Sequence, residues 1–404
     1  MIHRHYIGLS SGSSLFGVDA ALVLAEGLGS DLTFHLERYH HVPHSDGLRD
    51  LLTQVTASPT PQLKHVATLH RVLGEAYAVA ARQLLEQTRR PDVLCIGCPG
   101  QLLWHDPDGR YPSALQIGMA AVVAERTGIT TLSDFSSRDI SLGGHGLPIT
   151  SLVDAMLFRH PEEHCVLIHL GSVATVVSMP PGSNPGGRHV VGFEAAPGTM
   201  LLDGLMRLLT NGREPYDACG KHAVQGRCLE PLLERWMQSA FFQRRPPKCL
   251  PRADFGAEFL NAAVEQAKQM KGNLHDVLCT MTHFVARSIV RSVLGELPAP
   301  PARVILSGKG VRNGFLWHLL EQKLHPIPLE KSDVYGVAAE ACKAVAHAGL
   351  AALAMDGVPL NLPSVTGATG ARLLGQFTPG NSENWARCLT WMARLAAPAQ
   401  AAVA

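Results

Sequence analysis

Residues 7–22 read IGLSSGSSLFGVDAAL, and this stretch decides the fold. Apolar runs at 6–10 and 18–24 flank a turn at 11–17 that is rich in Gly and Ser. Such a pattern predicts two strands joined by a tight connection. Glycine lets a backbone approach a phosphate closely, and successive N–H groups in a turn form a cradle for an anion. The stretch therefore predicts a hairpin that carries a candidate phosphate site.

A second hairpin of the same kind is predicted in the middle of the chain. β-Branched runs at 165–170 and 173–179 flank the pair Gly171 and Ser172, which indicates the same structural unit used twice. Elsewhere helical periodicity alternates with short strands, which is typical of an α/β protein. The helices are expected at 66–87, 117–127, 200–210, 229–241, 255–268, 277–295 and 314–323, and the remaining strands at 93–97, 130–133 and 303–307.

A third glycine turn follows the strand expected at 303–307. It contains Gly308, Lys309, Gly310 and Asn313. One such turn is more often structural than functional, because hairpins need Gly or Ser in any case. Three at strand ends, two of them in equivalent hairpins, point to a nucleotide held between two related domains. The chain lacks the G-x-x-x-x-G-K-[ST] pattern of P-loop proteins and the strand–GxGxxG–helix unit of Rossmann dehydrogenases.

Length and composition exclude several classes of protein. At about 150 residues per domain, 404 residues correspond to two or three domains. With 46% hydrophobic and 17% charged residues the chain is neither disordered nor fibrous. A net charge of +1 without a basic tract gives no reason to expect nucleic acid or an anionic membrane as a partner.

The cysteines and the N-terminus favour a cytoplasmic protein. The nine cysteines are an odd number scattered along the chain, which favours reduced thiols. Residues 1–6 lead straight into a strand-like run, without the apolar core of a signal peptide. Cys95 and Cys98 form a CxxC pair, but no second pair with zinc spacing exists. No metal site formed by protein ligands is therefore predicted.

Motifs that occur together in one known family are spread over nearly the whole chain. Residues 7–22 are similar to its opening, G-x-M-S-G-T-S-x-D-G-x-D-x-A-L, and GGHGLP at 143–148 matches its central segment. GFEAAPG at 192–198 stands where that family has G-F-D-T-G-P-G. Residues 246–252 resemble its P-P-K-S-T-G-R, and residues 361–368 its closing motif. The chain thus resembles the anhydro-N-acetylmuramic acid kinases.

The resemblance implies an actin/hexokinase-like, ribonuclease H-like fold of two domains around a cleft. The implied boundaries are 1–145 plus 361–404 for the N-terminal lobe and 146–360 for the C-terminal lobe. In the family's reaction, a water attacks the anomeric carbon of a 1,6-anhydro sugar. The freed 6-oxygen takes the γ-phosphoryl group of ATP, which Mg²⁺ accompanies. The resemblance also implies a cytoplasmic homodimer that acts in peptidoglycan recycling.

The resemblance assigns candidate roles to individual residues. Glu194 stands at the position of the family's general base. The expected contacts to ATP are Ser11, Gly12, Ser13, Ser14, Gly17, Asp19, Gly171, Ser172, Gly308, Lys309, Gly310 and Asn313. The expected contacts to the sugar are Gln101, Asp139 and Lys343.

Several of these positions depart from the family pattern. Phe16 replaces an aspartate of the first turn, Glu194 replaces an aspartate by a longer carboxylate, and Lys343 replaces a glutamate. One interpretation is a kinase with a rearranged site that is slow or acts on another anhydro sugar such as levoglucosan. A second is a module that binds a sugar or nucleotide without efficient turnover, and a third is a structural protein. Ligand-dependent thermal stabilisation separates the second from the third.

Other charged residues leave alternatives open. Lys248 and Arg252 either clamp an anionic group of the substrate or form structural ion pairs. Asp139 either contacts the sugar or caps a helix. His40, His41 and His44 lack the spacing of a metal site and are expected to be solvated.

Overall fold

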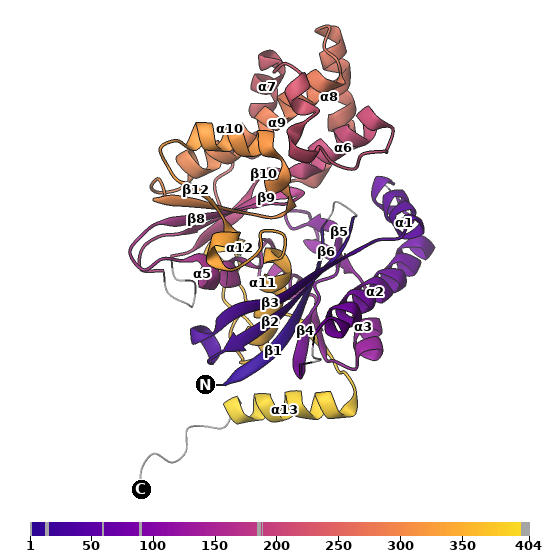
Figure 1. Ribbon diagram of the computed structural model, residues 1–404, viewed down its shortest axis with the longest axis vertical. Coiled ribbons are helices and arrows are strands. Elements are labelled where there is room, and N and C mark those ends of the chain that lie inside the picture. The colour runs from indigo at the N-terminus through magenta and orange to yellow at the C-terminus, as the bar shows by residue number, and fades with distance from the viewer. Residues whose placement is uncertain are drawn as a thin grey trace. The chain divides into compact units, whose positions relative to one another are not determined.

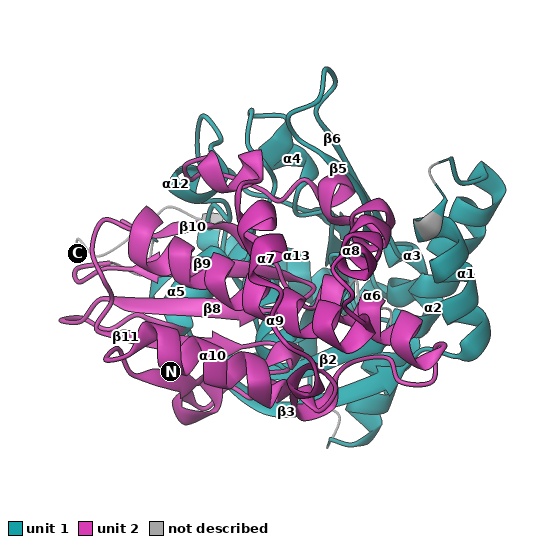
Figure 2. Ribbon diagram, turned by 90° about the horizontal axis from the view of Figure 1, so that it is seen from above, with its two compact units in different colours: residues 1–157, 185–187, 341–404 teal, residues 158–184, 188–340 magenta. Residues whose placement is uncertain are grey.

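The structure is a computed structural model that describes residues 2–12, 16–58, 60–88, 91–183, 187 and 189–396. The chain divides into two compact units, drawn in teal and magenta in Figure 2. The first unit comprises residues 1–157, 185–187 and 341–404, and the second comprises residues 158–184 and 188–340. Each unit is built around its own β-sheet.

The first unit contains a six-stranded sheet with the order β13-β7-β4-β1-β2-β3. β1, β2 and β3 are antiparallel neighbours, whereas β4 runs parallel to β1 and β7 parallel to β4. The strands are β1 (His3–Ser11), β2 (Gly17–Glu26), β3 (Thr33–Pro43), β4 (Val93–Gly97), β7 (Thr131–Ser133) and β13 (Gln376–Thr378), with a separate hairpin of β5 (Gln101–Asp106) and β6 (Ser113–Ile117). The helices are α1 (Asp46–Ala57), α2 (Leu63–Glu86), α3 (Ala120–Thr127), α4 (Ser137–Ile140), α5 (Ser151–Phe158), α11 (Cys342–Met355), α12 (Pro363–Thr366) and α13 (Ser382–Ala396) (Figure 1).

The two faces of β1 carry different helices, because successive residues of a strand point to opposite sides. Ile7 and Leu9 belong to the core that α2 completes with Leu69 and Leu73. Gly8 faces α11, and a Cβ at Gly8 would lie 1.8 Å from the carbonyl oxygen of Ala344. The missing side chain therefore lets α11 lie directly on the strand that leads into the first glycine turn.

The second unit contains a five-stranded sheet with the order β10-β9-β8-β11-β12. β8, β9 and β10 are antiparallel neighbours, whereas β11 runs parallel to β8 and β12 parallel to β11. The strands are β8 (Cys165–Leu170), β9 (Val173–Met179), β10 (Val191–Pro197), β11 (Arg303–Ser307) and β12 (Leu329–Lys331). The helices are α6 (Thr199–Thr210), α7 (Glu230–Met237), α8 (Ala257–Gln269), α9 (Leu274–Arg291) and α10 (Gly314–Leu324).

The two sheets share one topology. In each, three consecutive antiparallel strands are followed by two strands that run parallel to the first, on its other side. This is the duplicated ribonuclease H-like unit of the actin/hexokinase fold. The expectation of one unit used twice is confirmed by the two strand orders.

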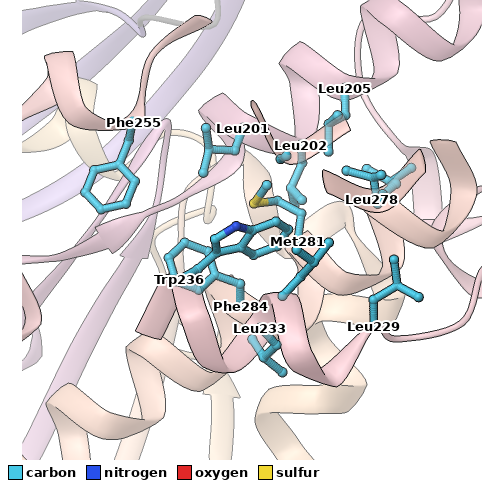
Figure 3. Close-up of a cluster of buried hydrophobic side chains, with 14 of the residues drawn as sticks. Leu201, Leu202, Leu205, Leu229, Leu233, Trp236, Phe255, Leu278, Met281 and Phe284 are labelled. Atoms are coloured by element: carbon cyan, nitrogen blue, oxygen red, sulfur yellow. The ribbon is translucent and has the colours of Figure 1, made fainter. Parts of the chain in front are cut away.

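A helical core of the second unit holds α6 in place. Figure 3 shows the indole of Trp236 from α7 next to Met281 and Phe284 from α9. The rings of Trp236 and Phe284 meet edge-on with their centres 5.7 Å apart. Leu201, Leu202 and Leu205 insert the apolar face of α6 into the same cluster. The N-terminus of α6 is thereby fixed against the second glycine turn.

Helix α9 and the π-helical turn after it are long and apolar enough to cross a membrane. However, 72% of this apolar window is buried inside the protein, as expected for a core helix. All nine cysteines are free thiols. Cys95 and Cys98 are buried, so burial raises the pKa of both thiols.

The structure corrects the expected boundaries at several places. The helix expected at 117–127 begins only at Ala120, because residues 113–117 form β6 and Gly118 has a φ of 126°. The helix expected at 229–241 already ends at Met237. Residues 146–157 and 341–360 lie in the first unit rather than the second, since α11 packs on β1.

Candidate functional site

The first glycine turn is anchored by a chain of hydroxyl groups inside the first unit. Ser11, the last residue of β1, donates a hydrogen bond to Oε1 of Gln101 at 2.8 Å. The hydroxyl of Tyr77 on α2 contacts the same Ser11 oxygen. Because serine has only one hydroxyl proton, Tyr77 is the donor in this contact. Gln101 and Tyr77 are buried, so the start of the turn is held by hydrogen bonds to the interior of the first unit.

The rest of that turn is partly described. Gly12 is exposed beyond the end of β1, and Gly17 begins β2. Ser13 and Ser14, two expected contacts to ATP, lie outside the described residues. Phe16 is partly buried, and its carbonyl oxygen accepts a hydrogen bond from the backbone N–H of His44 at 3.0 Å.

Asp19 lies on β2 opposite Ser10. Its Oδ1 accepts hydrogen bonds from the Tyr39 hydroxyl and from Nδ1 of His41, both at 2.7 Å. Both partners come from β3, a strand that the sequence pattern did not predict. The expectation of a solvated His41 is therefore wrong, since its ring is bonded to a buried carboxylate. It is also wrong for His44, which is buried.

The second and third glycine turns meet at one end of the sheet in the second unit. A Cβ at Gly308 would lie 2.6 Å from the carbonyl oxygen of Leu170, and one at Gly310 would lie 2.8 Å from the same oxygen. The turn after β11 therefore packs directly on the β8–β9 turn of Gly171 and Ser172. Lys309 is partly buried between the two glycines, in a 3₁₀ turn.

The side chain of Asn313 caps a helix. Asn313 precedes α10, and its side-chain oxygen accepts a hydrogen bond from the backbone N–H of Leu316 at 3.0 Å. This is the ordinary N-cap arrangement, and it satisfies a donor of the first helical turn. The cap fixes the end of the third glycine turn.

The N-terminus of α6 holds the second glycine turn. The backbone N–H groups of Thr199 and Met200 donate to the carbonyl oxygens of Gly171 and Ser172 at 2.8 and 3.1 Å. Gly198 lies directly against this turn, where a Cβ would come within 2.2 Å of the Gly171 oxygen. Since α6 follows β10 at once, the turn and the strand that carries Glu194 form one rigid piece.

Glu194 is a buried carboxylate in the middle of β10, only 3% exposed. Its Oε2 accepts a hydrogen bond from the backbone N–H of Leu250 at 2.8 Å. Its Oε1 accepts one from Nη2 of Arg252, also at 2.8 Å. The register of β10 against β9 shifts between Glu194 and Ala196, a strand irregularity of the kind common next to active sites. The site thus holds one carboxylate with each oxygen oriented by a donor.

Lys248 supports this arrangement from the interior. Its Nζ lies 2.9 and 2.8 Å from the two carboxylate oxygens of Glu296, and the ammonium lies over the rings of Phe193 and Phe241. Burial lowers the pKa of Lys248, although Glu296 acts in the opposite direction. The backbone oxygen of Lys248 accepts from the N–H of Glu194 at 3.2 Å. Of the two alternatives for Lys248, the structure shows the ion pair.

Asp139 is completely buried in the first unit. Its Oδ1 accepts from the Asn361 amide at 2.7 Å and from the Thr366 hydroxyl at 2.8 Å. Its Oδ2 accepts from the backbone N–H of Gly146 at 2.7 Å. These bonds join the segment at 143–148 to the closing segment at 361–368. The alternative that Asp139 caps a helix is therefore wrong.

Lys343 belongs to a polar chain at the start of α11. Its Nζ donates to the Thr150 hydroxyl at 2.8 Å, and that hydroxyl donates to Oδ2 of Asp154 at 2.9 Å. Burial raises the pKa of Asp154, whereas Lys343 and Thr150 act to lower it. One turn further along, burial lowers the pKa of His347 to about 3, so its neutral ring donates from Nδ1 to the Leu9 oxygen.

Comparison with known proteins identifies the family. Residues 4–380 match the profile of the anhydro-N-acetylmuramic acid kinases. A protein of this name from Cyanothece is 36% identical over 377 residues, which cover 92% of this chain and 99% of that protein. One from Salinibacter ruber is 34% identical over 388 residues, which cover 93% and 97%. The chain belongs to the anhydro-N-acetylmuramic acid kinase family.

Solved structures align with this chain at much lower identity. The activator of 2-hydroxyisocaproyl-CoA dehydratase from Clostridium difficile is 12% identical, with a TM-score of 0.40 and coverage of 85% of this chain and 93% of that one. An inorganic polyphosphate/ATP-glucomannokinase from Arthrobacter is 13% identical, with a TM-score of 0.35 and coverage of 87% and 99%. The fold assignment rests instead on the matching strand orders of the two sheets.

Because the chain belongs to a family of sugar kinases, we expect it to bind ATP and a carbohydrate. Within the described residues, no three or more His, Cys, Asp or Glu side chains gather in a way that could hold a metal ion. The described candidates of the anhydro-N-acetylmuramic acid kinase motifs fall into separate groups. Ser11 lies with Gln101, Asp139 with the closing segment, and Glu194 with Arg252.

Sequence reasoning missed three neighbours of these groups. Tyr77 lies inside a predicted helix, where an aromatic residue signals only a core position. Leu250 contributes its backbone N–H, for which no sequence signal exists. The ring of His169 lies beside two glycine turns, because Cβ atoms at Gly171 and Gly308 would lie 3.2 and 3.0 Å from it. A polar residue at the end of a predicted strand was the available signal for His169.

Proposed function

We propose that this chain is an ATP-dependent kinase that opens and phosphorylates 1,6-anhydro-N-acetylmuramic acid, giving the 6-phosphate. The observation that carries the proposal is Glu194, a carboxylate at the family's base position with each oxygen oriented by a donor. A base must be held in place to be effective, and proton abstraction by a placed carboxylate contributes about 10²–10⁴ in rate. Membership in the family supplies the reaction type.

The proposed reaction begins with the carboxylate of Glu194. Glu194 takes a proton from a water molecule, and the water oxygen forms a bond to the anomeric carbon of the sugar. The bond from that carbon to the bridging oxygen breaks, which opens the 1,6-anhydro ring. The bridging oxygen becomes the 6-oxygen and forms a bond to the γ-phosphorus of ATP, while ADP leaves with the electrons of the broken P–O bond. The proton on Glu194 is then returned to solvent.

The glycine turns are proposed to bind the phosphates of ATP. Gly308 and Gly310 have no side chain between their backbone and the Leu170–Gly171 segment, so the two turns form one close-packed edge of backbone. Backbone N–H groups in such turns suit an anion, and Lys309 adds a positive charge to the same edge. In the first unit, the hairpin with Ser11, Gly12, Gly17 and Asp19 is proposed as a further phosphate-binding turn.

Magnesium is proposed to arrive with ATP rather than in a protein cage. Phe16 offers no ligand, and Oδ1 of Asp19 already accepts from Tyr39 and His41. The described residues therefore do not fit a Mg²⁺ ion held mainly by the protein. Mg²⁺ bound to phosphates and water needs only one or two carboxylates.

The sugar contacts and the cellular setting belong to the same proposal. Gln101, Asp139 and Lys343 are proposed to form the sugar side, with Asp139 acting by fixing the segments at 143–148 and 361–368. The free cysteines are compatible with a cytoplasmic protein. A homodimer and a role in peptidoglycan recycling are proposed from family membership.

A second candidate function is binding without efficient turnover. It is favoured by Phe16 in the first turn and by the fact that both oxygens of Glu194 are already engaged. Such a protein would sense the same sugar or nucleotide. Another anhydro sugar such as levoglucosan is the remaining alternative for the substrate.

A coupled assay of ADP release tests the proposal. The purified protein is incubated with Mg²⁺-ATP and either anhydro-N-acetylmuramic acid, levoglucosan or no sugar. We expect ADP release only with the muramic sugar, and a 6-phosphate product in mass spectrometry. ADP release only with levoglucosan would identify levoglucosan as the substrate. No ADP release, together with thermal stabilisation by the sugar or ATP, would favour the binding function.

A further inference from the structure

We propose that Lys343 is a catalytic residue whose ammonium binds the transferred γ-phosphoryl group and the sugar 6-oxygen that receives it. This inference rests on the proposed function and adds a positive charge at the first glycine turn. It concerns a feature of this chain, because the family pattern has a glutamate at the position of Lys343 and an aspartate at that of Phe16.

The helix α11 runs antiparallel to β1. At one end, Nη2 of Arg4, near the start of β1, donates to Asp356, which directly follows α11, at 3.1 Å. Toward the other end, the ring of His347 donates to the backbone oxygen of Leu9 at 2.8 Å. The N-terminal end of α11 therefore lies beside the end of β1 that leads into the first glycine turn.

Lys343 reaches the level of that turn. It precedes His347 by four residues, which correspond to about 6 Å of helix. About two residues of β1 cover the same distance, from Leu9 to Ser11, where the turn begins. Lys343 is also the one residue of α11 that is not buried. The polar group that α11 offers to a ligand is therefore an ammonium level with the turn.

The ammonium of Lys343 is held in place and keeps donors for a ligand. Its Nζ donates to the Thr150 hydroxyl at 2.8 Å, and that hydroxyl donates at 2.9 Å to Oδ2 of Asp154, which is buried. A lysine ammonium has three donors. Thr150 is its hydrogen-bond partner among the described residues, so two donors remain. One suits a phosphoryl oxygen and the other the 6-oxygen of the sugar.

The first glycine turn also contacts a residue of the proposed sugar side. Gln101 accepts a hydrogen bond from Ser11 at 2.8 Å. A sugar bound by Gln101 and a phosphate bound by the turn would therefore meet at Ser11, the residue that is level with Lys343. Opening of the anhydro ring places negative charge on the bridging oxygen, and the γ-phosphoryl group brings more. A fixed ammonium stabilises this charge in the transition state.

The two departures from the family pattern fit one change in the source of positive charge. The aspartate and the glutamate of the family are possible ligands of a Mg²⁺ ion, whereas Phe16 and Lys343 are not. Lys343 instead carries a positive charge of its own. The first glycine turn thus keeps a cation although two carboxylates are missing.

The test measures ADP release and nucleotide binding in five proteins. They are the parent, Lys343→Met, Lys343→Ala, Lys343→Glu, and Lys64→Met as a control at an exposed lysine of α2. ADP release from Mg²⁺-ATP and anhydro-N-acetylmuramic acid gives kcat and KM. Isothermal titration calorimetry with Mg²⁺ compares ADP with AMP-PNP, a non-hydrolysable analogue that carries the third phosphoryl group. Circular dichroism verifies folding, and Lys343→Met combined with Asp154→Asn removes both charges if the single variant unfolds.

We expect Lys343→Met to lower kcat about 10²-fold and to change KM for the sugar little, because the ammonium acts on charge that develops in the transition state. Added propylammonium should restore part of the activity of Lys343→Ala. Lys343→Glu, although it introduces the family's residue, should be slower than Lys343→Met, since it places a negative charge beside the phosphoryl group. Lys64→Met should behave as the parent. Turnover of Lys343→Glu or Lys343→Met equal to that of the parent or higher would overturn the proposal.

Calorimetry separates this inference from the proposed function. The ratio of the affinities for AMP-PNP and ADP should be about 10-fold lower in Lys343→Met than in the parent, because one charge-assisted contact to the third phosphoryl group is lost. If the parent releases no ADP but shows this difference, the kinase function fails and Lys343 still binds the phosphoryl group. The same ratio in both proteins would overturn the role of Lys343 whatever the kinetics show.

Discussion

Gly198 and Gly171 lie so close that a Cβ at Gly198 would come within 2.2 Å of the Gly171 carbonyl oxygen. This approach joins the strand that carries Glu194 to the second glycine turn, four residues after Glu194 in sequence. The proposed base and the proposed phosphate turn of the second unit are therefore positioned by the same short segment. A change at Gly198 should disturb both.

The Gly198→Ala substitution tests this connection. The added methyl group would lie within 3.2 Å of three backbone atoms, those of Gly171, Ser172 and Ala174, so the β8–β9 turn must shift. Overpacking of this kind costs about 1–3 kcal/mol of unfolding free energy. We expect a lower thermal midpoint and a KM for ATP raised several-fold. Gly295→Ala is the matched control, because nothing lies within 4 Å of a Cβ there. Equal ATP kinetics in the two variants would show that the turn tolerates the shift.

Tyr77→Phe removes the hydroxyl that donates to Ser11. The partly buried Ser11 oxygen then loses one partner, a loss worth about 0.5–1.5 kcal/mol. We expect a folded protein with a modestly lower thermal midpoint and weaker ATP binding in calorimetry, since Ser11 begins the first glycine turn. Tyr111→Phe, at an exposed tyrosine, should leave both quantities unchanged. ATP affinity equal to that of the parent would separate the hydroxyl chain from the nucleotide site.

The buried pair of Lys248 and Glu296 predicts a strong non-additivity in stability. Lys248→Met leaves the Glu296 carboxylate without its cation and should cost about 3–5 kcal/mol in urea unfolding. The double variant Lys248→Met, Glu296→Leu replaces both charges by apolar groups and should recover most of the loss. The single variant Glu296→Leu completes the comparison. If the loss of unfolding free energy in the double variant equals the sum of the losses in the two single variants, the result contradicts a buried pair.

The shifted pKa of Asp203 on α6 should make the free energy of unfolding depend on pH. Burial raises the pKa of Asp203 to about 7, although Thr199 and Arg207 act to lower it. The unfolded chain releases this proton near pH 4, whereas the folded chain keeps it up to about pH 7. The contribution of Asp203 to stability is therefore complete below pH 4 and is lost as the pH rises to 7, by about 4 kcal/mol at most.

Asp203→Asn removes this titration and keeps the size of the side chain. The difference in unfolding free energy between the parent and Asp203→Asn should shift in favour of the variant as the pH rises from 4 to 7, and level off above it. Urea unfolding at a series of pH values measures this difference. A difference that is constant with pH would mean that Asp203 has an ordinary pKa in the folded protein.

The hairpins and the glycine turns could be predicted from the sequence because their signals are local. The runs at 165–170 and 173–179 form β8 and β9 with the expected limits, since β-branched residues on both sides of a Gly-Ser pair leave few alternatives. β10 could not be found in this way. It contains Gly192, Glu194 and Pro197, which are poor strand formers, and it is a strand only because β9 pairs with it.

The partners within the candidate site depend on tertiary contacts, which one sequence does not reveal. The pairing of Glu194 with Leu250 and Arg252 joins residues 56 and 58 positions apart. Asp139 could be singled out by its motif, but its partners Asn361 and Thr366 come from the far end of the chain. Residue types in a motif thus predict where chemistry is possible, and the fold determines which side chains meet.

The role of Glu194 as the base is tested most directly by ADP release from Mg²⁺-ATP and anhydro-N-acetylmuramic acid in the parent, Glu194→Gln and Glu194→Asp. Calorimetry of sugar binding accompanies each measurement. We predict that Glu194→Gln, which keeps the shape and removes the base, lowers turnover about 10²-fold or more and changes sugar affinity little. Glu194→Asp keeps a carboxylate and should retain measurable turnover. Equal turnover in the parent and in Glu194→Gln would contradict the assignment of Glu194 as the base.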